Sequence, residues 1–504
     1  MSGIFNAFAG VTPGGAGPVL GGSQGGALSN FEDLQKALQA SNYQTDVSTL
    51  TGGGSLGVQS LDTAMKTVVQ ENDNFTLFNM LQSTNATNIV DEYVRQSGVG
   101  GVLGGSANGQ MGTVRAASGQ YAREVGLVKF LMSLRQVGYV LNIGKNIVEA
   151  TAVEERNGAL QLLTDAEYLL FHGNASASPT QFDGIYAQLD AQIAAGNQSP
   201  DCMYDMQGAK LNDVKPFTAI NVAVSRYGSF GKSTDAFLPM SAQTDLNSDL
   251  DPAYRWMPSG SNTPTLGGHV EAIRLTHGPL KTHMDVFQHD ENHPMIMPWD
   301  GSSDPQYTAA ATSNVGIIPT SVTVATNSDP SSTFNVSRAG NYYWGVASID
   351  ATGNGYSAVT KSTITAVAGG YNAVLTITRS SAGTESGYAI YRSRQNGTNA
   401  SSDMRLVKVI PVAGATTTFT DENLYIPGTC NVPLLNMGPA ADAIGWRQFQ
   451  PMTKIPLPFG VGGVPVISWF QFLFGYLRVT KPKHHGYIRN VLASNAVWRP
   501  FTNE

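Results

Sequence analysis

The chain has 504 residues, of which 41% are hydrophobic and only 13% are charged, and its 30 basic and 37 acidic residues give a net charge of −7. Soluble domains carry about 25% charged residues, so the predicted surface is polar but poor in charge, and the acidic excess argues against sequence-specific nucleic-acid binding. The two cysteines, Cys202 and Cys430, are too few for a disulfide framework or a cysteine-based zinc site and favour a reducing compartment.

The first 60 residues are predicted to form an extended arm. They contain 13 glycines and four charged residues, which is too little apolar and helix-forming material for a separate core. One short helix is predicted near Phe31–Ala40, and a second over Leu61–Gln82. Residues 1–30 contain no Lys or Arg, so a secretory signal with a basic start is not expected.

A long hairpin is predicted next. Residues Asn88–Arg95 alternate like a strand, residues 97–112 hold seven glycines and no charge, and Tyr121–Val140 again has a strand pattern. A hairpin with no sheet beside it is marginal in water, so we expect a neighbouring molecule to supply its packing surface. The candidate assembly residues are Gly100, Gly101, Gly104, Gly105 and Lys129.

Residues Lys145–His172 give the clearest helix pattern, because Leu160, Leu163 and Leu170 lie on one stripe. Gly173 stands where a helix of this kind ends. Shorter helices are predicted from Phe182 to about Ala195 and over Lys215–Tyr227. Three strands should follow these helices: Asp235–Met240, His269–Thr276 and Lys281–Phe287.

From Val315 to about Pro433 the pattern is entirely that of short strands separated by turns, as in a β-sandwich. The predicted strands are Ile317–Val324, Thr333–Val336, Asn341–Ile349, Val359–Val367, Asn372–Thr378, Gly387–Arg392, Arg405–Ile410 and Thr416–Thr420. Mixed helix and strand patterns lie on both sides, which indicates an insertion. The uncharged stretch Ile455–Leu477 contains three prolines and four glycines, so it is predicted to be a loop and a buried strand and not a membrane helix.

Several short motifs resemble catalytic or binding sites without the required context. Gly228–Thr234 resembles a phosphate-binding loop, but Arg226 replaces the first glycine and the loop is predicted to follow a helix and precede a strand. Gly21–Gly25 matches a nucleophile-elbow string inside the glycine-rich arm, where neither strand nor helix flanks it. Both are therefore rejected, and no catalytic group or cofactor is expected.

Two charged segments leave alternatives open. His289–His293 resembles a zinc-protease string, but Asp290 replaces its glutamate and Pro294 disfavours a helix. A polar loop is the preferred interpretation, and a metal site with the nearby residues is the alternative; those residues are His277, His283, Asp285 and Asp300. Near the C-terminus the basic residues are Arg478, Lys481, Lys483, His484, His485 and Arg489. They are predicted to form a solvated edge, with weak contact to packaged nucleic acid as the alternative.

The order of these elements resembles that of the major capsid protein of tailed bacteriophages. The quoted segments are Asp165–Gly173, Phe182–Tyr186, and Gln471–Val479 with Lys481 and Pro482 after it. They resemble the end of a long spine helix, the turn that follows it, and a late core strand. The resemblance covers about residues 60–300 and 435–500. Within the insertion, Asn341–Ser348 and Tyr388–Arg392 resemble fibronectin type III or immunoglobulin-like domains.

The resemblance implies an α+β capsid fold of the Hong Kong 97 type with an inserted immunoglobulin-like sandwich. The implied parts are an arm (1–60), a core (61–311 and 434–504) and the insertion (312–433). Within the core, the hairpin loop is expected at about 84–140, the spine helix at about 145–173, and an axial domain at about 200–300 and 434–475.

The implied function is structural and not enzymatic. Copies of the chain would form hexamers and pentamers of an icosahedral head that is assembled in the host cytoplasm and encloses double-stranded DNA, which it contacts weakly. Portal and decoration proteins are implied partners, and scaffolding would come from a separate protein because the arm is too short to supply it. The family's cross-link from a hairpin lysine is not transferred to Lys129, since no partner is identified. The alternatives are a glycan-binding surface adhesin and an encapsulin-type compartment shell.

Overall fold

The computed structural model describes residues 75–143, 149–249, 271–288, 316–350, 352, 356–459 and 465–503. The chain divides into two units, residues 1–68 with 145–149 and the remainder, and every element below belongs to the second unit. Several predicted features lie outside the described residues: the arm 1–60 with its helix and its Gly21–Gly25 motif, most of Leu61–Gln82, His289–His293 and Asp300.

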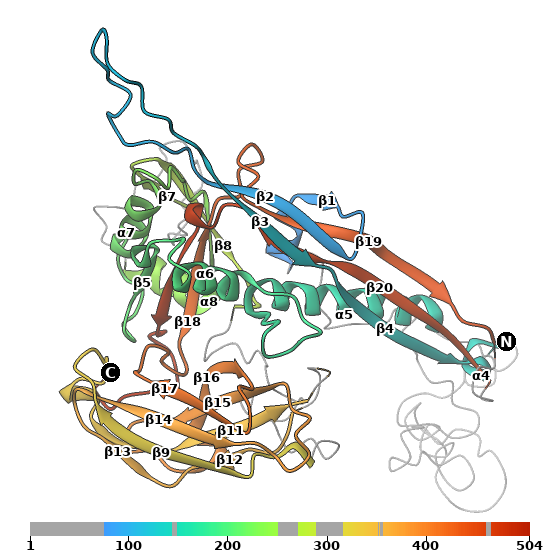
Figure 1. Cartoon of the computed structure of the whole chain (residues 1–504). Coiled ribbons are helices and arrows are strands. Elements are labelled where there is room, and N and C mark those ends of the chain that lie inside the picture. The colour runs from blue at the N-terminus through green and yellow to red at the C-terminus, as the bar shows by residue number, and fades with distance from the viewer. Residues whose placement is uncertain are drawn as a thin grey trace, which may run out of the picture. The chain divides into compact units, whose positions relative to one another are not determined.

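A long four-stranded sheet lies against one helix (Figure 1). Its strand order is β1–β19–β20–β4, and the helix is α5, Ala150–His172. Strands β4 and β20 are antiparallel from Lys129 opposite Gly475 to Gly138 opposite Val466. The strands are β1 Ser83–Asn85, β4 Lys129–Gly138, β19 Ile444–Pro456 and β20 Val466–Val479. The predicted strand within residues 455–477 is thus confirmed.

Helix α5 has 23 residues and a length of about 35 Å, and its predicted end is confirmed. The described part begins at Ala150, five residues after the predicted start. Beyond the end, Gly184 donates its N–H to the carbonyl of Gly173 at 2.9 Å, and a Cβ on Gly173 would lie 2.3 Å from the carbonyl oxygen of Phe182. Glycine is required there by close backbone approach. Helix α6, Ile185–Ala194, begins directly after this turn.

A six-stranded sheet in the order β5–β21–β18–β6–β8–β7 forms a second layer, and α7 (Lys215–Val224) packs on it. Its strands are β5 Met203–Asp205, β6 Asp235–Leu238, β7 Ala272–Leu275, β8 Gly278–Met284, β18 Cys430–Leu435 and β21 Gly486–Val491. Two predictions are corrected. The helix predicted to reach Tyr227 ends at Val224, and the strand predicted to reach Met240 is followed at Met240 by a new helix, α8, Met240–Asp249.

Residues 321–421 form two sheets that share one apolar core. Trp344 and Tyr388 of the first sheet and Leu375 of the second are fully buried in it. The first sheet has the order β12–β11–β15–β16 and the second β17–β14–β9, with β10–β13 as a separate pair. The strands are β9 Ser321–Ser328, β10 Gly340–Tyr342, β11 Trp344–Ile349, β12 Thr360–Lys361, β13 Thr365–Val367, β14 Tyr371–Thr378, β15 Gly387–Ser393, β16 Met404–Pro411 and β17 Thr416–Asp421.

Three strand predictions in this region are corrected. Thr333–Val336 is not a strand, and a 3-10 turn, Val336–Arg338, begins at its last residue. Asn341–Ile349 and Val359–Val367 each divide into two strands, because β11 and β12 pair in one sheet whereas β10 and β13 pair with each other. Cys430–Pro433, predicted as the end of the insertion, lies in β18, which pairs with β21 and β6 of the six-stranded sheet.

The C-terminal segment joins the two-sheet region to the rest of the body. Phe501 is 4% exposed within the apolar core of that region, and the guanidinium of Arg338 lies 4.6 Å from the centre of its ring. Gln395 donates its N–H to the carbonyl of Pro500 at 2.8 Å. Ser494, earlier in the same segment, donates its N–H to Asp245 of α8 at 2.8 Å. The last residues therefore bridge both parts.

A separate two-stranded ribbon completes the described fold: β2, Val90–Gly98, and β3, Gln120–Leu127. The predicted continuous strand Tyr121–Val140 is corrected, since it breaks at the buried Val128 into β3 and β4. Short helices α3, Thr76–Met80, and α4, Tyr139–Ile143, lie before and after these strands.

Candidate assembly surfaces

The ribbon has one face toward the body and one toward solvent. Alternate residues along both strands are exposed, as the period of a strand requires. On the outer face Val90 lies opposite Leu127 and Val94 opposite Arg123. Val90 is 48% exposed and Val94 67%, and an ion pair between Arg123 and Glu92 of 3.2 Å lies among these apolar side chains. The outer face is therefore largely apolar and uncovered.

The inner face is held to β19 and β20 by a polar cluster. Asp91 accepts hydrogen bonds from Arg447 at 2.8 and 2.9 Å and from the hydroxyl of Tyr476 at 2.6 Å. The hydrogen bonds from Arg447 hold the pKa of Asp91 below its ordinary value. Gly126, opposite Asp91, leaves room for the Tyr476 ring, because a Cβ there would lie 2.2 Å from that ring. Residues of β19 and β20 in the same chain thus supply the hydrogen-bonding partners of the inner face.

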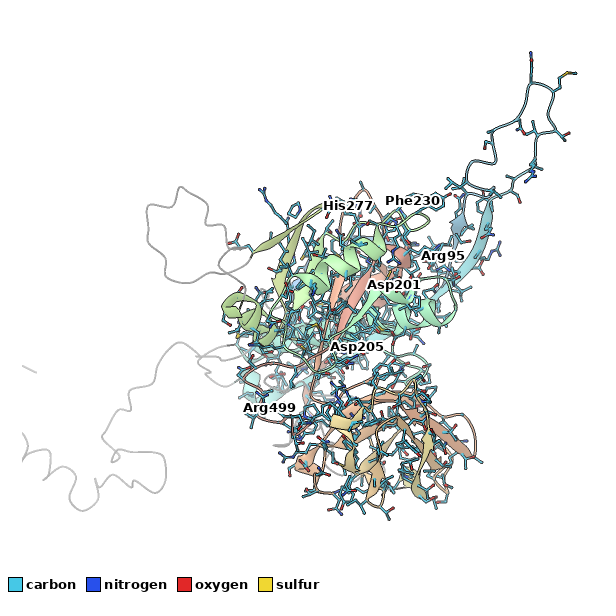
Figure 2. All side chains as sticks on the ribbon, turned by 90° about the vertical axis from the view of Figure 1, so that its left-hand side faces the viewer. Arg95, Asp201, Asp205, Phe230, His277 and Arg499 are labelled. Atoms are coloured by element: carbon cyan, nitrogen blue, oxygen red, sulfur yellow. The ribbon has the colours of Figure 1, made fainter. Side chains whose placement is uncertain are left out.

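The tip of the ribbon extends away from the body in both views (Figures 1 and 2), and Arg95 marks its root in Figure 2. Gly100, Gly101 and Gly104 have positive φ angles of 84°, 82° and 77°, which residues other than glycine adopt only at a cost. Gly105 does not have a positive φ, but a Cβ on it would lie 2.9 Å from the carbonyl oxygen of Val102. Large apolar side chains on the tip are 74–99% exposed: Val99, Val102, Leu103, Met111 and Val114.

Lys129 lies at the first position of β4, opposite Gly475 of β20, and not on the ribbon as predicted. Its ammonium group donates to the carbonyl of Pro179 at 2.5 Å. The break at Val128 therefore separates Lys129 from the four glycines of the tip.

A second apolar surface, which was not predicted from the sequence, lies on β4 and β20, and we call it the aromatic face. Gln471 of β20 and Ser133 of β4 hydrogen-bond to α5, so their neighbours along each strand point to the opposite side. Ring centres on that side are 5.0–5.8 Å apart along the series Phe130, Phe474, Phe472 and Phe470. Met132 is 61% exposed and Leu134 50%. The members of the aromatic face are Phe130, Met132, Leu134, Phe470, Phe472 and Phe474.

The aromatic face continues the surface on which the ribbon rests. Tyr476 and Arg478, the next residues on that side of β20, contact Asp91 and the ring of Tyr93 on the inner face of the ribbon. The ribbon therefore covers one end of this surface, whereas Phe470, Phe472 and Phe474 beyond it are partly buried and Phe130 is exposed. Alternation in the sequence signals such a strand but cannot show which face stays uncovered.

The C-terminal basic residues do not form the predicted solvated edge. Arg489 pairs with Asp205 at 2.8 Å, and the Arg478 guanidinium lies over Tyr93. His485 is fully buried, accepts from the Asn436 N–H at 3.1 Å, and burial lowers its pKa to about 4. Lys481 donates to the carbonyl of Ala441, and His484 contacts the side-chain amide of Asn436, so five of the six residues are engaged in the body.

The other candidate sites have structural surroundings. Gly228–Thr234 follows α7 and precedes β6, as predicted, which is the reverse of a phosphate loop. His283 lies 2.8 Å from Asp235 on the adjacent strand. No metal-holding group of His, Cys, Asp or Glu occurs in the part of the chain that the structure describes. A pocket of about 500 Å³ lies beside α7, and Asp201, which Figure 2 labels, is one of the residues that line it.

Among the helices within the described ranges, none combines the length and apolar character needed to cross a bilayer.

Neither a protein-family model nor a curated protein matches the chain. Several solved structures do. The capsid of a native GTA particle has 8% identity and a TM-score of 0.47, over 88% of this chain and 99% of that one. The chain is similar to capsid shells. A structure named for Microbacterium phage Oxtober96 has 8% identity and a TM-score of 0.40, over 87% of this chain and 96% of that one. The SrpI encapsulin of Synechococcus elongatus PCC 7942 has 10% identity and a TM-score of 0.36, over 86% and 93%.

Proposed function

We propose that the chain is the major capsid protein of a tailed bacteriophage, which assembles through hexamers and pentamers into an icosahedral head around double-stranded DNA. The observation that carries the proposal is the ribbon. Residues of β19 and β20 hydrogen-bond to its inner face, whereas its outer face and tip expose large apolar side chains. These apolar side chains leave water only when a further surface covers the outer face.

A second copy of the chain is the proposed covering surface. The ribbon and the aromatic face are different surfaces of one molecule, so a contact between them is heterologous and can close into rings. A contact of this kind buries roughly 800 Å² per partner, and several such contacts on each subunit act together in a closed shell. The low charge of the chain reduces repulsion between the many copies.

The glycines of the tip are proposed to let one chain fit both pentamers and hexamers. Gly100, Gly101 and Gly104 occupy backbone conformations open to glycine, and Gly105 permits a close turn. Lys129 is proposed to fix the start of β4, directly after the ribbon, through its hydrogen bond to the carbonyl of Pro179.

The two-sheet region is proposed to be an immunoglobulin or fibronectin-like domain carried on the shell, inserted within residues 312–433, of which the last four belong to β18, with the core on either side and the arm at 1–60. Two sheets around one apolar core support this proposal.

Packaged DNA would be contacted weakly, since five of the six C-terminal basic residues are engaged within the body.

A matched pair of surface variants tests the proposed function. Val94→Asp places a charge on the outer face of the ribbon, where the side chain is 67% exposed and its loss costs the subunit little. Val336→Asp does the same on the two-sheet region, at a residue 86% exposed. We expect Val336→Asp and the unchanged chain to form closed particles in negative-stain images, and Val94→Asp to remain as soluble subunits.

Closed particles from Val94→Asp would refute the role of the ribbon. An unchanged chain that stays monomeric and binds glycans would refute the shell function and favour the adhesin. Particles that enclose a protein cargo in place of DNA would favour the encapsulin-type shell.

A further inference from the structure

Two buried carboxyl groups lie close to helix α3. Glu167 is on α5, and Asp285 follows β8 directly; both are 0% exposed. Oδ2 of Asp285 is buried with no hydrogen-bond partner among the described residues, and the charge of Asp285 acts on Glu167. Carboxyl groups seldom occupy such positions without a compensating charge, so the pair requires an explanation.

Glu167 holds the start of helix α3. Its Oε1 accepts the N–H of Leu77 at 2.6 Å and its Oε2 accepts the N–H of Phe78 at 2.8 Å. These groups belong to the first turn, where N–H donors have no partner inside the helix, and the N-cap residue Phe75 offers no side-chain acceptor. A residue 90 positions away in sequence therefore caps this helix.

The segment after β8 holds the same helix from the other side. The hydroxyl of Thr76 donates to the carbonyl of Met284 at 3.1 Å, and the rings of Phe75 and Phe287 stack at 5.6 Å. Asp285 lies between these two contacts and accepts the N–H of Phe287 at 2.8 Å. α3, α5 and the end of β8 thus meet at the carboxyl pair.

The surroundings offer the pair little positive charge. Burial raises the pKa of Tyr186 of α6, and the charges of Cys430 of β18 and of Asp285 raise it further. His172 of α5 lies 3.3 Å from the carbonyl of Phe287 and stacks on Tyr168, whereas α3 contributes no titratable side chain. Among the described residues, none that shifts the pKa of Glu167 or Asp285 is a Lys or Arg. Burial raises the pKa of Glu167 to about 9, with a further rise from the charge of Asp285, and burial raises the pKa of Asp285 to about 6.

We propose that Glu167 and Asp285 share one proton and form a pH-sensitive latch that holds α3 against the spine helix α5. With the proton present, one O–H joins the two carboxyl groups while the oxygens of Glu167 accept both α3 amides. Once the proton is lost to solvent, two negative charges face each other in a buried site, and separating them breaks the cap on α3.

The direction of the pH effect follows from proton binding. The folded pair binds protons more tightly than the unfolded chain does, so its contribution is complete below about pH 4 and declines as the pH rises toward 9. The latch concerns the single chain and does not depend on the proposed function. Only its consequence rests on that function: in a shell, alkaline pH would free α3 to change partners.

Hydrogen exchange of the peptide 75–82, measured by mass spectrometry on the full chain at pH 5.5–9.5 and corrected for intrinsic rates, tests the latch. We expect protection to fall at least tenfold between pH 6 and pH 9. Asp285→Asn should make this fall smaller and move it to lower pH, because the repulsion from Asp285 is removed while burial still raises the pKa of Glu167. Glu167→Gln should lower protection at every pH without a pH step.

The matched control is Asp245→Asn, which alters a buried carboxylate that accepts the N–H of Ser494 and not an amide of α3. It should retain the pH step of the unchanged chain, whatever it does to global stability. A flat profile in the unchanged chain, a full step in Asp285→Asn, or unaltered protection in Glu167→Gln would each overturn the latch. Each profile is compared with itself across pH, so a uniform loss of stability in a variant does not obscure the result.

Discussion

Substituting one glycine at the root of the ribbon should detach it. In Gly126→Ala the new Cβ would lie 2.2 Å from Cζ and the hydroxyl oxygen of Tyr476, well inside the 3.4–4 Å of ordinary contact. Tyr476 is 5% exposed and cannot swing into solvent without leaving Asp91. Overpacking of this kind costs about 1–3 kcal/mol, and the lost hydrogen bond to a charged group about 1.5–3 kcal/mol.

The combined cost of about 3–5 kcal/mol raises the detached population of the ribbon at least a hundredfold, at 1.4 kcal/mol for each factor of ten. Hydrogen exchange of peptides within 90–98 and 120–127 measures this population, and urea titration measures the global free energy of unfolding. The control is Gly138→Ala at the end of β4, where a Cβ would meet nothing within 4 Å. Equal exchange in the two variants would show that the ribbon is not seated on Tyr476.

Two further predictions follow from the same contacts. Arg447 lowers the pKa of Asp91, so the stability that this pair contributes is present above about pH 4 and is lost as the pH falls through the folded pKa of Asp91. Hydrogen exchange of the ribbon should therefore accelerate on acidification, while that of α3 should not. Phe501→Ala should lower the free energy of unfolding of the two-sheet region by about 3 kcal/mol, measured by thermal and urea denaturation, whereas Val497→Ala, at a residue 91% exposed, should leave it unchanged; equal effects would disprove the anchoring role of Phe501.

Local sequence signals predicted the elements whose boundaries are set locally. Helix α5 ends at His172 because Gly173 and Gly184 allow two backbone segments to approach closely, and the two glycines show this need in the sequence. Most strands of the β-rich region could also be predicted, since short strand patterns are separated there by turn residues. The division of Tyr121–Val140 left a signal that was overlooked, because the exposed residues of this segment stand at odd positions in β3 and at even positions in β4. The strand with which each of them pairs could not be read from this pattern.

The surfaces and the buried pair required three-dimensional information. Phe470, Phe472 and Phe474 alternate as in any half-buried strand, and the alternation does not show that β4 aligns Phe130, Met132 and Leu134 beside them. Glu167 did leave a signal that was overlooked, since it occupies the same helical stripe as Leu163 and Leu170. A carboxyl on an apolar stripe indicates a buried partner, but its identity, Asp285, lies more than a hundred residues away.

The strand pairings also set the order in which the parts of the chain can fold. The four-stranded sheet needs β20, which ends at Val479, and the six-stranded sheet needs β21, which ends at Val491, so neither sheet is complete until its late strand has left the ribosome. Residues 321–421 form their sheets from local pairings and can fold during synthesis, whereas the contacts of the ribbon with Arg447 and Tyr476 can form only later. Late closure of long-range pairings of this kind is slow. A nascent chain therefore cannot hold the ribbon in its native arrangement, and the association proposed above would wait until β20 and β21 are made.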